Sequence, residues 1–522
     1  MSVGGRILME GSHRQGRLAA RIGLLALLAF TASALGSEVR RSEGSIGAGR
    51  DWMTPYTIID SGRAGPTVMV VGGVHGDEPA GAAAAEQIRH WPIVRGRLIV
   101  IPRANPRALA ADSRLTPGVE KDAANLNRNF PSTRPGDEPR GGHADDLWRF
   151  VRQQRPTWLL DLHEGFAASQ TNPNSVGSSI ITQPSDEALA ASTLMLEAVN
   201  ATIAEKDKHF VQRRSPIGGS LARAAAVQLG ARTMILETTR TGQPLSTRVR
   251  QHRIMVDRFL RHVDMLADSL APDRLVPADR PAGQVFVALY DGDGSAGKGV
   301  PRVLEILGAL PDVRVERVGP ADIRAGVLDQ FDVVMFTGGT GSGQAKALED
   351  AGRAAVRRFV GSGGGYVGIC AGAYLACSGF DWGLGILDAK TRSSLWRRGT
   401  GTVKLAVSGD AILGLGMGEF DVRYANGPIL EPARDEKIPD YVTLATFGTE
   451  LAENDTPKGI MVGSPAAVAG DFGRGRVLCF SPHPEQSPGL DRAVIQAVRW
   501  AAAPRGAARS PDPAGGRRTG GP

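Results

Sequence analysis

The chain has 522 residues, of which 42% are hydrophobic and 22% charged, and this composition excludes general disorder. At about 150 residues per domain, the length allows two or three domains. The formal charge of +7 comes largely from arginines near the two ends, without a basic helix or an aromatic-interleaved basic patch. We therefore expect solvated ends and no nucleic-acid partner.

The first predicted element is an export signal over residues 1–36. Arginines precede an apolar run from Ile22 to Leu35, and Ala32 and Ala34 have the spacing of a cleavage site. The run is about 14 residues long, which is shorter than the roughly 20 residues that cross a bilayer. We expect an exported protein, periplasmic or extracellular, without a stable membrane span.

A first domain is predicted over residues 45–270, with residues 51–60 as a lead-in. Apolar strands alternate with segments of helical periodicity, which favours an α/β fold in which helices flank the sheet. The strands are TVMVVGG, RLIVIPRAN, WLLDLHEG and TMILETT, and the helical stretch is DEALAASTLMLEAVNATIAEK.

Three residues at strand ends are candidate zinc ligands. His75 and Glu78 follow the strand TVMVVGG, and His163 ends the strand WLLDLHEG. Open α/β sheets build their sites at the carboxyl ends of strands, and a catalytic zinc takes three nitrogen or oxygen ligands and one water. A lone histidine is more often a packed residue, so the prediction depends on the three together. We expect one Zn²⁺ per chain.

Acidic residues near these ligands have separate predicted roles. Glu237, in TMILETT, lies at another strand end and would accept the proton of zinc-bound water. Asp161 could orient a ligand from behind. Glu164 could compete as a ligand, but neighbouring residues of a strand point to opposite faces, so only one of His163 and Glu164 should reach the metal.

Residues 56–265 resemble the succinylglutamate desuccinylase and aspartoacylase branch of the zinc carboxypeptidase superfamily. GGVHGDE resembles its metal motif, NLNRNFP its substrate-binding segment, DLHEG its third-ligand motif and ILET its catalytic-glutamate motif, in the family's order. The resemblance implies a mixed sheet flanked by helices, and it implies that Glu237 acts as the general base and then as the general acid.

The same resemblance implies roles for polar residues upstream. Asn127 and Arg128 would hold a substrate carboxylate, which a guanidinium grips through two hydrogen bonds. Arg114 would polarise the scissile carbonyl, with Arg103 and Arg107 as nearby alternatives. The segment Pro131–Asp146 is expected to be an irregular loop.

A proline-rich stretch over residues 271–283 is predicted to be a linker, after which a second α/β domain spans residues 284–503. Its strand signals are QVFVALY, FDVVMF, GGGYVGI and RVLCF. The tail over residues 504–522 is too poor in apolar residues to fold and is expected to be disordered.

Cys370 is a candidate nucleophile at a strand-to-helix turn within GGGYVGICAGAYLA, where small neighbours are needed. His483 and Glu485, in SPHPE, would supply its base and the orienting acid. The alternative is a buried core thiol. Backbone amides of Gly338 and Gly339 could contribute to an oxyanion pocket, although glycines there equally suit an ordinary turn.

The three cysteines, Cys370, Cys377 and Cys479, do not suggest a disulfide framework. Cys370 and Cys377 are expected on one helix, about 10 Å apart along its axis, which is too far for a bridge.

Residues 284–503 resemble the class I glutamine amidotransferase superfamily, and GICAGAYLA, YANGP and FSPHPE are most similar to its biotin-protein-ligase amino-terminal-type domains. The resemblance implies a flavodoxin-like fold. Nothing here resembles a biotinylation catalytic domain, and no ammonia-accepting domain accompanies it.

The first hypothesis is therefore a zinc-dependent deacylase or carboxypeptidase that hydrolyses an amide bond of a small-molecule or peptide substrate with a free carboxylate. One alternative is a thiol amidase centred on Cys370. Another is an envelope protein that binds peptides without turnover. The sequence predicts neither the substrate nor the oligomeric state.

Overall fold

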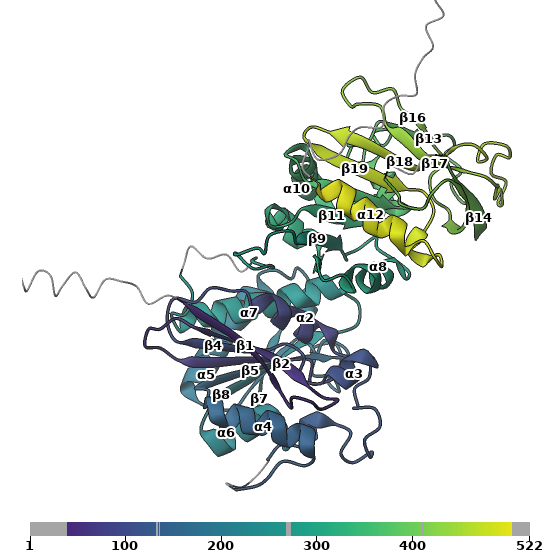
Figure 1. The fold of residues 1–522 in the computed structure, drawn as a ribbon. Helices are drawn as coiled ribbons and strands as arrows, with labels where there is room; N and C mark the ends of the chain where they lie inside the picture. Colours follow the sequence, from purple (N-terminus) through teal and green to yellow (C-terminus); the bar gives the residue numbers. More distant parts are fainter. Residues whose placement is uncertain (1–38, 132–133, 135, 268–272, 409–411, 504–522) are drawn as a thin grey trace, which may run out of the picture.

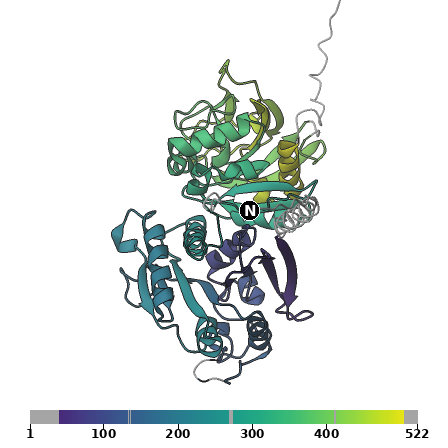
Figure 2. The same cartoon turned by 90° about the vertical axis from the view of Figure 1, so that its left-hand side faces the viewer.

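The computed structural model describes residues 39–131, 134, 136–267, 273–408 and 412–503. The predicted export signal, the predicted disordered tail and the start of the predicted linker lie outside these residues. The described chain forms two α/β lobes that are joined through one contact region, as two views at right angles show (Figures 1 and 2). None of the described helices is long and apolar enough to cross a membrane.

The first lobe is an eight-stranded mixed sheet in the order β1-β2-β4-β3-β5-β8-β6-β7. The strands β4, β3, β5 and β8 run parallel at its centre. Its strands are β1 (Arg40–Ile46), β2 (Thr54–Asp60), β3 (Thr67–Gly72), β4 (Arg97–Ile101), β5 (Trp158–Gly165), β6 (Ser179–Thr182), β7 (Val211–Arg214) and β8 (Arg232–Thr239).

Helices cover both faces of this sheet. Successive residues of β3 point to opposite faces, and because the residues on both faces are apolar, each face has to be covered. Val68 and Val70 pack with helices α2, α5 and α7, whereas Met69 and Val71 pack with α4 and α6. The helices are α2 (Pro79–Ile88), α3 (Pro106–Ala110), α4 (Gly142–Gln154), α5 (Asp186–Asn200), α6 (Leu221–Leu229) and α7 (Leu245–His262), with short 3-10 turns η1 (Leu126–Arg128) and η2 (Lys206–Lys208).

Two sequence expectations for this lobe were wrong in part. The lead-in over residues 51–60 contains strand β2, which pairs with β1 in an edge hairpin. The segment Pro131–Asp146 is not a loop to its end, because α4 begins at Gly142. The hairpin has no alternating pattern in the sequence because most of β1 is exposed.

The second lobe is a nine-stranded sheet in the order β10-β9-β11-β12-β19-β18-β17-β14-β15, with a separate β13-β16 ladder. Its first five strands are parallel and the remaining four extend the sheet in antiparallel fashion. The strands are β9 (Val285–Tyr290), β10 (Val313–Val318), β11 (Val333–Phe336), β12 (Gly365–Ile369), β13 (Ala389–Thr391), β14 (Thr400–Val407), β15 (Gly418–Ala425), β16 (Leu430–Pro432), β17 (Val442–Phe447), β18 (Pro465–Phe472) and β19 (Gly475–Phe480).

Two apolar clusters fill the space on either side of this sheet. Val287 and Leu289 of β9 pack on the side of helices α8 and α12, and Phe286 and Ala288 pack on the side of α10. The helices are α8 (Gly299–Gly308), α9 (Pro320–Arg324), α10 (Gly341–Gly361), α11 (Ala371–Ala376) and α12 (Asp491–Ala502), with the 3-10 turns η3 (Val327–Gln330) and η4 (Pro484–Gln486).

Helix α7 joins the lobes through buried charges. Asp322 of α9 is 2% exposed and accepts hydrogen bonds from Arg253, which is 1% exposed, and from Arg250 at 2.8 Å. Ser246, at the start of α7, donates to the carbonyl oxygen of Asp291. These buried ion pairs hold α7 of the first lobe against α9 of the second lobe.

Within the predicted linker, Leu275 and Val276 are buried in the core of the second lobe. The indole of Trp91 in the first lobe donates to the carbonyl oxygen of Arg274 at 3.0 Å. The described part of this segment is therefore packed against both lobes.

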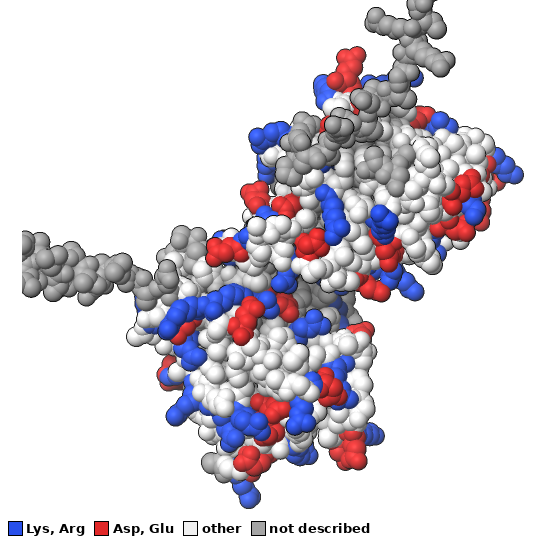
Figure 3. All heavy atoms as spheres, viewed as in Figure 1, with Lys and Arg blue, Asp and Glu red and all other residues white. Residues whose placement is uncertain are grey.

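On the face shown in Figure 3, basic and acidic side chains are interspersed.

Candidate functional site

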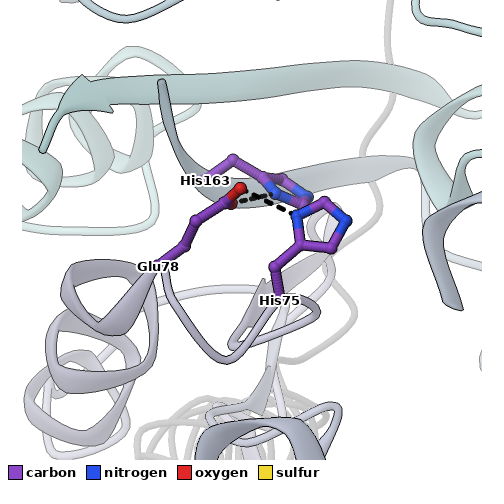
Figure 4. Close-up of side chains that lie close together, drawn as sticks. All are labelled: His75, Glu78 and His163. Atoms are coloured by element: carbon purple, nitrogen blue, oxygen red, sulfur yellow. Dashed lines mark hydrogen bonds and ion pairs between the residues drawn. The ribbon is translucent and has the colours of Figure 1, made fainter. Parts of the chain in front are cut away.

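Three predicted ligands converge at the carboxyl ends of β3 and β5. His75 lies in the loop after β3, Glu78 caps the start of α2, and His163 lies on β5. Because β3 and β5 are parallel neighbours with Gly72 opposite Leu162, their ends meet at one edge of the sheet. The side chains point toward one another (Figure 4).

The geometry of these three side chains suits a metal. One ligand atom from each of His75, Glu78 and His163 lies within 4.8 Å of the others, and all three residues are buried. The two carboxylate oxygens of Glu78 contact Nδ1 of His75 at 2.9 Å and Nδ1 of His163 at 2.7 Å. Two imidazoles and a carboxylate are a donor set that fits zinc.

Partners behind the histidines fix their rings. The amide oxygen of Asn125 lies 3.1 Å from Nε2 of His75, and a carboxylate oxygen of Asp161 lies 3.1 Å from Nε2 of His163. Both Nδ1 atoms are thereby left to face Glu78. Such outer partners orient a metal-binding imidazole and raise its basicity. The structure supports the orienting position predicted for Asp161 and adds Asn125.

The charges in this site act on one another. Burial alone would raise the pKa of Glu78, but the imidazoles of His163 and His75 hold it well below its usual range. Burial alone would lower the pKa of His163, but Asp161 and Glu78 raise it well above its usual value. The site therefore favours a negative Glu78 next to a positive group.

Glu237 lies beside the metal ligands on the neighbouring strand. It is directly opposite His163 in the parallel pairing of β5 with β8, and it is 7% exposed. Burial raises its pKa to about 8. A carboxyl group with a pKa near neutrality can both take up and release a proton at physiological pH.

Glu164, the competing ligand candidate, turns away from the trio. It pairs with Arg248 of α7, and its other oxygen accepts a hydrogen bond from the backbone N–H of Ala80 at 2.8 Å. The expected alternation of strand faces is thus observed at His163 and Glu164.

Of the two residues predicted to bind the substrate carboxylate, Asn127 is buried within the protein and Arg128 lines the cavity. Asn127 is 4% exposed, and its amide is used inside the protein: the oxygen accepts from the backbone of Leu221 at 3.0 Å, and the nitrogen lies 3.3 Å from Nε2 of His163. Arg128 lines the cavity of the site, and burial together with the nearby Arg114 lowers its pKa.

Arg114 is the arginine of its segment that reaches the site. Its guanidinium pairs with Glu78 at 2.5 Å, and the residue lines the cavity. Arg107 instead pairs with Asp51 at the surface at 2.9 Å, and Arg103 is exposed. The structure therefore favours Arg114 over both alternatives.

The trio and Glu237 open into a cavity of about 530 Å³, and several residues that line it were missed in the sequence. Arg213 and Arg214 enter from the short strand β7, and Arg240 enters from the residue after β8. Arg240 is fixed by Asp77 at 2.5 Å. The strand VQRR is four residues long, without an apolar pattern that would mark it.

The second lobe brings together a thiol, an imidazole and a carboxylate. Cys370 lies between β12 and α11 with φ of +52°, a strained value for a residue with a side chain. Nδ1 of His483 lies 2.8 Å from Glu485, which is fully buried. Burial alone would lower the pKa of His483, but hydrogen bonds with Cys370 and Glu485 raise it to about 10.

The surroundings of this thiol differ from expectation in one detail. Cys370 and Cys377 flank α11 rather than share it, because the helix begins at Ala371 and ends at Ala376. All three cysteines are free. Gly338 lies directly against the imidazole, because a Cβ there would be 2.7 Å from Cε1 of His483, and Gly339 has φ of +137°.

Comparisons with known families match each lobe separately. Residues 64–263 match the family described as succinylglutamate desuccinylase/aspartoacylase catalytic domain, which confirms the expected resemblance of this region. Residues 285–393 match the family described as biotin-protein ligase, N terminal. The second match ends before His483 and Glu485.

One curated relative is the N-alpha-acetyl-L-2,4-diaminobutyric acid deacetylase of Halomonas elongata, which is 34% identical over 119 residues. The match covers 22% of this chain and about a third of the relative's length, 32%.

Similar solved structures include a succinylglutamate desuccinylase/aspartoacylase from Rhodobacter sphaeroides, with 20% identity, 48% of this chain and 76% of the other covered, and a TM-score of 0.34. A product-bound ectoine utilization protein, EutE, from Ruegeria pomeroyi has 22% identity, 49% and 76% coverage, and a TM-score of 0.34.

Proposed function

We propose that the first lobe is a zinc-dependent amide hydrolase that acts on an N-acyl amino acid or peptide with a free carboxylate, as a deacylase or carboxypeptidase. The observation that carries the proposal is the buried trio His75, Glu78 and His163 with Glu237 opposite His163. The family match over residues 64–263 and the deacetylase relative support the same chemistry.

A zinc ion held by the trio would lower the pKa of a bound water and polarise the scissile carbonyl. Glu237 accepts the proton of the attacking water and then gives it to the leaving amine. Its raised pKa of about 8 suits both steps, because the carboxyl group exchanges a proton near neutral pH.

The arginines that line the cavity have two proposed roles, which are stabilisation of the developing negative charge and binding of the substrate carboxylate. Arg114, whose guanidinium pairs with Glu78 and lines the cavity, would stabilise the negative charge that develops on the carbonyl oxygen. Arg128 and Arg213 line the same cavity and can bind the substrate carboxylate. The amide of Asn127 is already hydrogen-bonded, so its role is to hold His163 and the start of α6.

The test combines metal content with turnover. We expect about one zinc per chain in the purified protein and zinc-dependent release of amine from N-acyl amino acids. Glu237→Gln should lower kcat by at least about a thousandfold while zinc content is unchanged. Glu187→Gln, an exposed carboxylate on α5, is the control. Metal-free protein that zinc cannot activate would refute the proposal.

A second candidate function is a thiol amidase in the other lobe, which we propose to have a flavodoxin-like amidotransferase fold over residues 284–503. The strained backbone of Cys370 and its link through His483 to Glu485 favour it. Cys370→Ala should abolish alkylation by iodoacetamide at this site and any zinc-independent amidase activity. Equal alkylation of wild-type protein and His483→Gln would contradict it.

We also propose that the protein is exported, on the basis of residues 1–36. Fractionation of cells that express the full chain should place it outside the cytoplasm. Retention in the cytoplasm would refute this part alone.

A further inference from the structure

The floor of the zinc-site cavity is apolar next to Glu237. Ile235 lies two residues before Glu237 and therefore points to the same face of β8. Ile235 is paired with Ile181 of β6, and Ile181 is paired with Arg213 of β7. All three line the cavity, so an isoleucine strip separates the reacting carboxylate from the outer arginine.

The contact of Gln212, the residue before Arg213 on β7, shows which face of the sheet carries this isoleucine strip. Gln212 hydrogen-bonds with Ser192 of α5 and therefore faces the helices on the opposite side. Arg213, the next residue, faces the cavity. Strands are about 5 Å apart, so the strip spans roughly 10 Å from β8 to β7.

Apolar side chains also form the rim of this cavity. Phe166 is 61% exposed and Ile217 is 54% exposed, and they come from separate segments after β5 and β7. The carbonyl oxygen of Phe166 accepts a hydrogen bond from the side chain of Thr241 at 2.7 Å, and Arg240 lies 6.0 Å from its ring centre.

Single exposed apolar residues are ordinary on protein surfaces. Phe166 and Ile217 differ because they line one cavity together with Val176 and the isoleucine strip. A substrate that offered only charged groups would leave this apolar surface in water, whereas an apolar group would bury it.

We infer that the substrate carries, besides its carboxylate, an apolar group of several carbon atoms that lies on Ile181, Ile235 and Ile217. This inference rests on the proposed amide hydrolysis and names its substrate class. The apolar group is either the acyl chain or an amino-acid side chain. Burial of one methylene improves binding about fourfold, so a partly open cavity should favour such substrates by at least about tenfold.

The experiment compares three substrates with the zinc-loaded full chain: N-acetyl-L-glutamate, N-octanoyl-L-glutamate and N-acetyl-L-leucine. We expect kcat/KM at least about tenfold higher for one apolar substrate than for N-acetyl-L-glutamate. A preference for the octanoyl compound assigns the acyl chain, and a preference for the leucine compound assigns the side chain.

Two variants test the residues. Ile217→Ser, at an exposed position, and Ile181→Thr, which keeps a β-branched shape, should each reduce that preference at least about threefold, mainly through KM. Met417→Ser, at a 79% exposed position in the second lobe, is the control. Equal kcat/KM for all three substrates, or equal effects of all three variants, would overturn the inference.

Binding separates this inference from the proposed function. Calorimetry with zinc-loaded Glu237→Gln protein measures affinity without turnover. Tighter binding of an apolar compound than of N-acetyl-L-glutamate supports the inference even if the wild type hydrolyses neither. Hydrolysis of all compounds at one rate with equal affinities supports the hydrolase and refutes the inference.

Discussion

Replacing Asp161 with asparagine is expected to weaken zinc binding by about 10- to 100-fold, which corresponds to about 1.4–2.7 kcal/mol. The carboxylate of Asp161 is fully buried and lies 3.1 Å from Nε2 of His163. Its oxygens have no other hydrogen-bond partner among the described residues, so the contact with His163 is their main interaction. Asparagine keeps the shape of the side chain and removes the charge that makes the imidazole a stronger ligand.

The expected loss depends on pH. Burial lowers the pKa of His163, but Asp161 and Glu78 together raise it well above its usual value, so a proton competes with the metal for this ring. Removing Asp161 lowers that pKa and eases the competition. The loss of zinc affinity should therefore be largest at about pH 9 and smaller at about pH 6.

A competition titration of the metal-free protein with a chromophoric zinc chelator measures this at both pH values. Asp312→Asn, a surface position paired with Arg499, is the control. Unchanged zinc affinity in Asp161→Asn at both pH values would refute the reasoning. A parallel loss of secondary structure by circular dichroism would instead assign Asp161 to the stability of β5.

Three further predictions concern the interface and the thiol site. Asp322→Ala leaves Arg253 buried without its partner and should lower the free energy of unfolding by about 3–5 kcal/mol in denaturant titrations; a loss below about 1 kcal/mol would contradict it. Glu316 of β10 accepts a hydrogen bond from Gln87 of α2 in the other lobe at 3.3 Å. Burial raises the pKa of Glu316 to about 7, so the folded state keeps a proton that the unfolded chain releases, and stability falls as pH rises from about 4.5 to 7. Glu316→Gln should remove that fall, which is about 3 kcal/mol for a pKa difference of about 2.5 between the folded and the unfolded chain, and an identical pH slope in both proteins would show that Glu316 does not cause it. Gly338→Ala places a Cβ against the ring of His483 and should slow alkylation of the thiol at least about threefold without changing zinc content, whereas an unchanged rate would mean that the ring has room to move.

The grouping of His75, Glu78 and His163 could be predicted because the first two lie in the segment between the apolar strand β3 and helix α2, and the third lies on the apolar strand β5. Chain order and strand-end position, together with the resemblance of the surrounding motifs to a known family, grouped these residues, because parallel strands bring their carboxyl ends to one edge. The pairing of Glu237 with His163 follows from the same arrangement.

Other parts of the site could not be predicted, because their signals depend on tertiary packing. Arg213 and Arg214 lie on a four-residue strand at the sheet edge, whose residues are exposed or half-buried and lack alternation. In the sequence, Asn125 looks like an ordinary turn residue. Its contact with His75 becomes visible only in the structure, where it precedes η1. The edge hairpin of β1 and β2 was missed because a largely exposed strand needs no apolar side chains.

Helix α7 has a practical consequence for expression of the two halves. Arg248 on this helix pairs with the carboxylate of Glu164, the residue after His163. About one and a half turns further along, Arg253 pairs with Asp322 of the second lobe. A clone that ends at the predicted linker would expose Arg253 to water and leave Asp322 behind on the missing half. Truncation would remove the packing partner of α7, the helix whose Arg248 pairs with Glu164 beside His163, so an inactive fragment would not distinguish loss of this support from loss of a catalytic group in the second lobe. Point variants in the intact chain are the sounder way to assign activity to either lobe.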